Sequence, residues 1–190
     1  MKEELIEILV EELSMKNFLS GILPKILPDG YVLNANCFIR DHQGKQDLKR
    51  SIPIKMRAYR HYKVPVKVII VHDQDSSECK LLKSELRKLT NKTPEIPSLI
   101  RIACRELEAW YLGDLDALEA IYPQFKSKMF KNWSLFRNPD ECNAYDELKR
   151  IIPTFQKGVA SKEISNYISL SQNRSKSFNQ FIHGIEKFLN

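Results

Sequence analysis

The chain has 190 residues, of which 43% are hydrophobic and 28% charged, and it carries a formal net charge of +6. This size suits a single domain that buries its own core without disulfide or metal staples, and the composition is that of an ordinary globular protein. No apolar run approaches the roughly 18 residues of a membrane span. The first 13 residues are too acidic for a signal or transit peptide, so we expect a cytoplasmic protein.

The first third of the chain predicts alternating strands and helices. Residues 5–13 fit either a helix or a short buried strand, and periodicity does not decide between them. Ser14 is a plausible N-cap for a helix over 15–27. Pro28-Asp29-Gly30 predicts a turn, after which we expect a strand over 31–39, a loop over 41–44 and a helix over 45–61 interrupted near Pro53.

The clearest predicted element is the strand Val64 to Val71, a β-branched run that suits the centre of a sheet covered on both faces. A helix capped by Ser76 or Ser77, a strand over 98–104 and a helix over 105–112 follow. This order predicts an α/β fold with a mostly parallel central sheet flanked by helices. We expect residues 1–114 to form the α/β core and 115–190 to form a helical extension packed on it, as one compact unit.

Acidic residues follow two of the predicted strands at the carboxyl end, and a third if residues 5–13 form a strand; this is the edge where open parallel sheets bind ligands. The three pairs are Glu11 and Glu12, Asp73 and Asp75, and Glu106 and Glu108. Like charges in one cleft repel, so a cation usually neutralises them, and hard carboxylate ligands select Mg²⁺ or Mn²⁺. Helix capping by the two aspartates and solvated roles for the later glutamates remain open alternatives.

The sequence signals for other classes of site are weaker. The four cysteines, Cys37, Cys79, Cys104 and Cys142, show no metal-ligand spacing, so we expect free thiols and no zinc. The chain has no P-loop or Rossmann glycine motif. An Asp-x-Asp after a strand also occurs in haloacid-dehalogenase-type phosphatases, but there it normally follows the opening strand, with Thr or Val where this chain has Ser77.

A cationic stripe covers residues 40–67. It contains nine lysines and arginines against two aspartates: Arg40, Lys45, Lys49, Arg50, Lys55, Arg57, Arg60, Lys63 and Lys67. Such a stripe suits a phosphate backbone or a solvated helix face, and both remain open.

Several motifs together resemble one family. In chain order they are EELS (11–14), GKQDL (44–48), VHDQDSSEC (71–79), RIACRELEAWYLGD (101–114) and NRSKSF (173–178). They resemble the bacterial domain-of-unknown-function family 4276, which is similar to Toprim domains, and the resemblance covers nearly the whole chain. It implies a Toprim-like, Rossmann-like sheet with Glu11 or Glu12 after the first strand and Asp73 and Asp75 after the third. Glu106 or Glu108 is then the candidate for a later metal-binding glutamate.

The resemblance implies a Mg²⁺-dependent nuclease that cleaves DNA or RNA as the effector of an anti-phage system, with an ATPase as its partner. The expected catalytic residues are Glu11, Asp73, Asp75 and Glu106. The expected phosphate-binding residues are Lys45, Lys49, Arg57, Arg60, Arg105 and Arg174. A non-catalytic Toprim-like subunit that binds an ATPase or nucleic acid is the alternative, and self-association is left open.

Overall fold

The computed structural model describes residues 1–190 and has a four-stranded, all-parallel sheet at its centre, with strand order β2-β1-β3-β4. The strands are β1 (Leu5–Val10), β2 (Cys37–Asp41), β3 (Val66–Asp73) and β4 (Ser98–Ala103). The predicted α/β class and parallel sheet are therefore confirmed. The ambiguous first segment is a strand, β1, that runs into helix α1.

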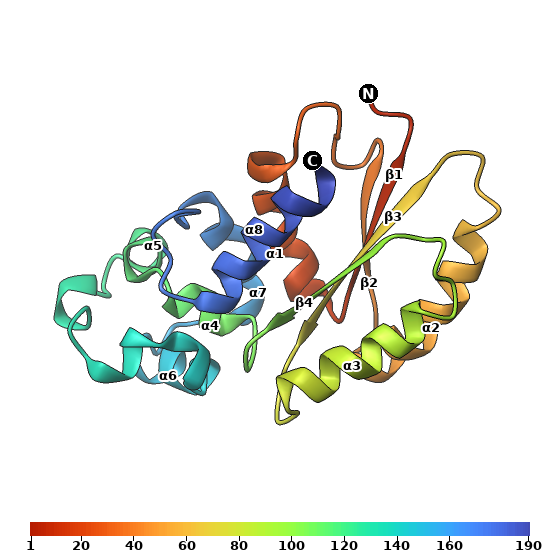
Figure 1. The fold of residues 1–190 in the computed structure, drawn as a ribbon. Coiled ribbons are helices and arrows are strands. Elements are labelled where there is room, and N and C mark those ends of the chain that lie inside the picture. The colour runs from red at the N-terminus through yellow and green to blue at the C-terminus, as the bar shows by residue number, and fades with distance from the viewer.

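Eight α-helices surround and extend the sheet. They are α1 (Leu13–Ile26), α2 (Lys45–Tyr59), α3 (Cys79–Thr90), α4 (Glu108–Leu112), α5 (Leu115–Ile121), α6 (Ala144–Ile151), α7 (Lys157–Glu163) and α8 (Lys176–Leu189). Helices α2 and α3 pack together on one face, while α1 and α8 cover the other (Figure 1). None of the helices combines the length and the apolar character that a membrane crossing requires.

The strand expected over 31–39 begins late, at Cys37. Residues 31–36 form a turn instead, because the Asn36 side chain accepts a hydrogen bond from Val32 N and donates to the carbonyl oxygens of Lys2 and Gly30. The expected cap at Ser14 is also wrong. Helix α1 starts at Leu13, and Ser14 Oγ donates instead to Glu12 Oε1 at 2.6 Å.

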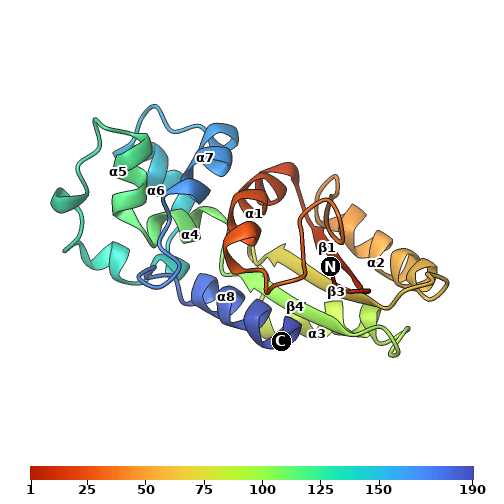
Figure 2. The same ribbon diagram turned by 90° about the horizontal axis from the view of Figure 1, so that it is seen from above.

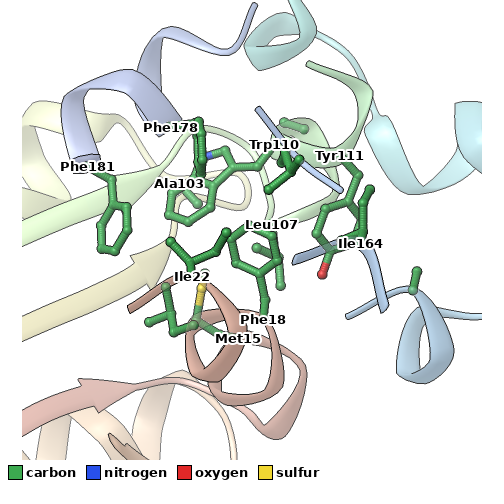
Figure 3. Close-up of a cluster of buried hydrophobic side chains, with 14 of the residues drawn as sticks. Met15, Phe18, Ile22, Ala103, Leu107, Trp110, Tyr111, Ile164, Phe178 and Phe181 are labelled. Atoms are coloured by element: carbon green, nitrogen blue, oxygen red, sulfur yellow. The ribbon is translucent and has the colours of Figure 1, made fainter. Parts of the chain in front are cut away.

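Successive side chains of each strand point to opposite faces of the sheet, so the protein has two hydrophobic cores, one on each face. On the face of α1 and α8 the core is aromatic, with Phe18, Trp110, Phe178 and Phe181 in contact (Figure 3). Trp110 Nε1 also donates to Ser177 Oγ at 2.8 Å. These contacts hold α8 against the segment that follows β4, which carries the predicted late glutamates.

Helices α4 to α7 gather beyond the carboxyl ends of the strands, as both ribbon views show (Figures 1 and 2). The helical extension therefore covers part of the sheet edge where the acidic residues leave the strands: Asp73 and Glu108 are buried there, whereas Asp75 stays exposed. This cover makes the edge a partly buried environment for charged side chains.

Candidate functional site

Strands β1 and β3 lie side by side and deliver acidic residues to the same edge of the sheet. Val10 pairs with Val71, so Glu11 and Asp73 leave the sheet as close neighbours. The turn before α4 brings Glu108 to the same place, where its side chain is 0% exposed and Asp73 is only 7% exposed. Carboxyl groups from three segments thus lie at one edge of the sheet, and those of Asp73 and Glu108 are buried there.

The inner part of the site contains Asp73, Glu108, Glu12 and Lys157. Lys157, at the start of α7, places Nζ 2.6 Å from Glu12 Oε1 and 3.5 Å from Glu108 Oε1. Burial, followed by the charges of Glu108 and Glu11, raises the pKa of Asp73 well above its usual range. Burial also raises the pKa of Glu108 to about 6, even though Lys157 opposes this shift. One lysine does not neutralise this group of buried acids.

The outer part of the site contains Glu11, Asp75, Lys45 and His72. Lys45 Nζ lies 3.1 Å from Asp75 Oδ2, and His72 Nδ1 lies 3.2 Å from Glu11 Oε2. Burial, followed by the charges of Asp75 and Glu12, raises the pKa of Glu11. Burial lowers the pKa of His72, which favours a neutral ring that does not balance Glu11.

Several buried carboxylate oxygens have no hydrogen-bond partner: Glu11 Oε2, Asp73 Oδ1 and both Oε atoms of Glu108. The buried hydroxyl of Tyr111 has none either. Leaving a buried charged group without a partner costs more than about 1–3 kcal/mol. Hard oxygen donors without sulfur fit Mg²⁺ or Mn²⁺ in chemistry. As they stand, however, no three Asp, Glu, His or Cys side chains form a ready-made metal-ligating group.

Capping of the following helix does not explain the two aspartates. The N-cap of α3 is Glu78, without a side-chain cap, so the expected cap at Ser76 or Ser77 is wrong as well. Asp75 adopts a left-handed backbone conformation with φ 52, and so does Arg105 with φ 62. Such conformations are costly for residues other than glycine and are concentrated at functional sites.

Backbone contacts join the loops after β3 and β4. Asp75 N donates to the carbonyl oxygen of Arg105 at 2.7 Å, and Arg105 N donates to Gln74 Oε1 at 3.0 Å. A shallow cavity of about 250 Å³ lies beside these loops, lined by Asp75, Ser76, Arg105, Glu106 and Asn143. An anion in this cavity would meet the exposed Arg105 next to the acidic cluster.

The two later glutamates have different surroundings. Glu106 Oε1 accepts a hydrogen bond from Tyr145 N at 2.8 Å, so this side chain is bound to the start of α6. Glu108 instead approaches Asp73 closely enough to raise its pKa. Of the pair that the sequence left open, Glu108 is the one whose oxygens accept no hydrogen bond in the cluster.

The predicted cations are dispersed. Lys45 lies at the site, whereas Lys49 pairs with Glu85 and Arg60 with Glu95. Arg57 is exposed on α2. Arg174 Nη1 donates to the carbonyl oxygen of Lys131, in a separate cavity of about 420 Å³ near α5.

The hydroxyls of the NRSKSF motif serve the fold. Ser175 caps α8, and both Ser175 Oγ and Ser177 N donate to Asp140, at 2.6 and 2.8 Å. Sequence reasoning missed Lys157, the closest cation to the inner carboxylates. Its neighbours in the chain carry no recognisable motif, so no local signal pointed to it.

Comparisons with known proteins give a family but no individual relative. Neither a curated protein nor a solved structure matches the chain. A family model described as "Domain of unknown function (DUF4276)" matches residues 10–186, a range that includes all six predicted acidic residues and Lys157. Because this match covers almost the whole chain, the protein belongs to the family of that description.

Proposed function

We propose that this protein is a Toprim-like, Mg²⁺-dependent nuclease that cleaves phosphodiester bonds in DNA or RNA. The observation that carries the proposal is the set of buried carboxylate oxygens on Glu11, Asp73 and Glu108 that accept no hydrogen bond, although His72 lies near Glu11 and Lys157 near Glu108. Buried charges are normally paired or bound to metals. A hard divalent cation is the ligand that would satisfy these oxygens without changing the fold.

The acidic and basic residues of the site would have different roles. Glu11, Asp73 and Glu108 would hold the cation, with Glu12 and Asp75 at the margins of the site. When bound, divalent cations at such a site activate water and neutralise charge on the phosphate and the leaving oxygen. Lys45 and Arg105 are exposed beside the carboxylates, where they would bind and orient the scissile phosphate.

A second candidate function is a non-catalytic Toprim-like subunit that binds an ATPase or nucleic acid. The absence of a ready-made group of three metal ligands favours this alternative. The contacts of Lys157 with Glu12 and Glu108 also favour it, because this lysine supplies positive charge where a metal would. In this case the carboxylates would hold α7 against the sheet.

The proposed function includes a cellular role and a protein partner. We propose a cytoplasmic effector that works with an ATPase in anti-phage defence, and this part depends on the family resemblance alone. Co-purification with an ATPase from the same cells tests the partnership. Asp73→Asn should leave such a complex intact, because the Asp73 side chain is buried and does not reach a protein surface.

Cleavage is the test of the main proposal. Wild-type protein, with and without its ATPase partner, would be incubated with plasmid DNA or RNA in Mg²⁺, Mn²⁺ or EDTA. We expect metal-dependent cleavage that Asp73→Asn lowers by about 100-fold or more, because losing a ligand should exceed the 10–100-fold effect of losing an outer-shell partner.

The control is Asp146→Asn, the same chemical change at an exposed residue of α6. It should cleave like the wild type, and circular dichroism should show that both variants are folded. Absence of cleavage by the wild type with every metal and with its partner would reject the nuclease. The non-catalytic alternative would then stand.

A further inference from the structure

One face of helix α3 carries three cations that have no acidic partner. Lys80, Lys83 and Arg87 follow an i, i+3, i+7 spacing, which places them on one side of the helix. Leu82 and Leu86 are the buried residues of the same helix segment. The three cations, together with Ser84, are the complete lining of a surface hollow of about 330 Å³.

The cationic stripe noted in the sequence is, by contrast, largely neutralised. Six of its nine lysines and arginines have an acidic oxygen within 4.0 Å: Arg40, Lys45, Lys49, Arg50, Arg60 and Lys67. A paired cation attracts a phosphate less than a free one, because the neighbouring carboxylate cancels most of its field. Lys55, Arg57 and Lys63 of the stripe also have no such partner, whereas the three free cations of α3 lie on one helix face and line one hollow together.

The position of α3 links this charge to the carboxylate site. The helix begins at Cys79, just after the loop that follows Asp73 and carries Asp75, and runs back along the sheet (Figure 1). Lys80 lies in its first turn, closest to that loop. From Lys80 to Arg87 the helix rises about 10 Å, which equals about three nucleotides of one strand of B-form DNA.

We propose that the α3 cationic face (Lys80, Lys83 and Arg87) binds the phosphate backbone of nucleic acid that flanks the bond at the carboxylate site. The inference rests on the proposed nuclease for the role of the bound nucleic acid as substrate. It changes the expected docking surface from residues 40–67 to α3. Phosphate contacts of this kind position the strand and carry no sequence preference of their own.

Binding is measured apart from cleavage, by fluorescence anisotropy of a labelled oligonucleotide in EDTA across a range of salt concentrations. The variant is K80Q/K83Q/R87Q. Three lost phosphate contacts should lower the slope of log affinity against log salt by about 2–3. At low salt we expect a loss of affinity of about tenfold or more. Each single variant should lower the slope by about 0.7–0.9, so one misfolded triple variant would not leave the inference untested.

The matched control is K162Q/K176Q/K187Q, which removes the same charge from exposed lysines of α7 and α8. Helix α8 covers the opposite face of the sheet from α3. This control should keep the wild-type slope to within about 1. Equal losses in both triple variants would mean that only net charge matters and would overturn the inference.

The remaining outcomes separate the two proposals. If K80Q/K83Q/R87Q binds oligonucleotide normally but loses binding to vesicles that contain phosphatidylserine, α3 is a membrane surface and the inference fails. If Asp73→Asn binds normally in EDTA and loses cleavage in Mg²⁺ while the α3 variant still binds normally, the nuclease stands and the α3 face is wrong. If no protein cleaves but the α3 variant alone loses binding, the face stands on a non-catalytic protein.

Discussion

Replacing Glu108 by Gln should stabilise the metal-free protein, although this residue is fully buried. Burial raises the pKa of Glu108 from 4.5 to about 6, so the folded state holds its proton more tightly than the unfolded chain does. The contribution of Glu108 to stability is therefore fully present below pH 4.5 and is lost as the pH rises through about 6. Above that range the ionised side chain costs the folded state about 2 kcal/mol.

Glutamine keeps the shape of the side chain and removes this cost. Lys157 keeps its 2.6 Å contact with Glu12 after this change. At pH 8 without metal, we expect Glu108→Gln to raise the free energy of unfolding by about 2 kcal/mol, or Tm by about 4–8 °C. At pH 4 the difference from the wild type should disappear.

The assay is urea denaturation followed by circular dichroism at both pH values, with EDTA present. Glu12→Gln is the matched control, because hydrogen bonds from Lys157 and Ser14 outweigh the effect of burial and lower the pKa of Glu12. Since Glu12 is 41% exposed, its loss should destabilise the protein at pH 8 by only about 1 kcal/mol or less. If Glu108→Gln did not raise the free energy of unfolding at pH 8 relative to pH 4, burial would not impose the expected cost on the ionised Glu108.

Lys157→Met should lower the stability of the metal-free protein by about 3 kcal/mol, because it leaves Glu108 uncompensated. The same change should increase the rise in Tm that Mn²⁺ produces. An unchanged rise would mean that Lys157 does not compete with the cation. Asp140→Ala should cost about 3 kcal/mol in urea denaturation, since Ser177 loses its charged acceptor. Arg174→Gln should leave the salt dependence of oligonucleotide binding unchanged; a lower slope would show a phosphate contact.

The fold was readable because its main signals are local. The β-branched run at Val66 to Val71 and the alternation of strands with helices predict a parallel sheet without any knowledge of long-range contacts. Where a contact with a distant residue decides the structure, prediction from the local sequence pattern fails. The strand expected from Tyr31 starts late because Asn36 bonds back to the N-terminal segment at Lys2.

In the candidate site, too, the local features were predictable and the contacts between distant residues were not. The positions of the strand ends were enough to predict where Asp73 and the neighbouring glutamates lie, because parallel strands share one carboxyl edge. Choosing between Glu106 and Glu108 required the start of α6, which binds the first and leaves the second free to approach Asp73. Lys157 follows Asp73 by 84 positions, and no sequence period connects residues that far apart.

A crystal structure soaked in Mn²⁺, with anomalous scattering to locate the metal, tests the central claim most directly. We expect an anomalous peak ligated by Asp73 and Glu108, together with Glu11 on the outer side, and Lys157 Nζ withdrawn from Glu108. Crystals of Asp73→Asn should show no such peak under the same soak. A wild-type crystal in which these carboxylates stay metal-free, with Lys157 still between Glu12 and Glu108, would contradict it.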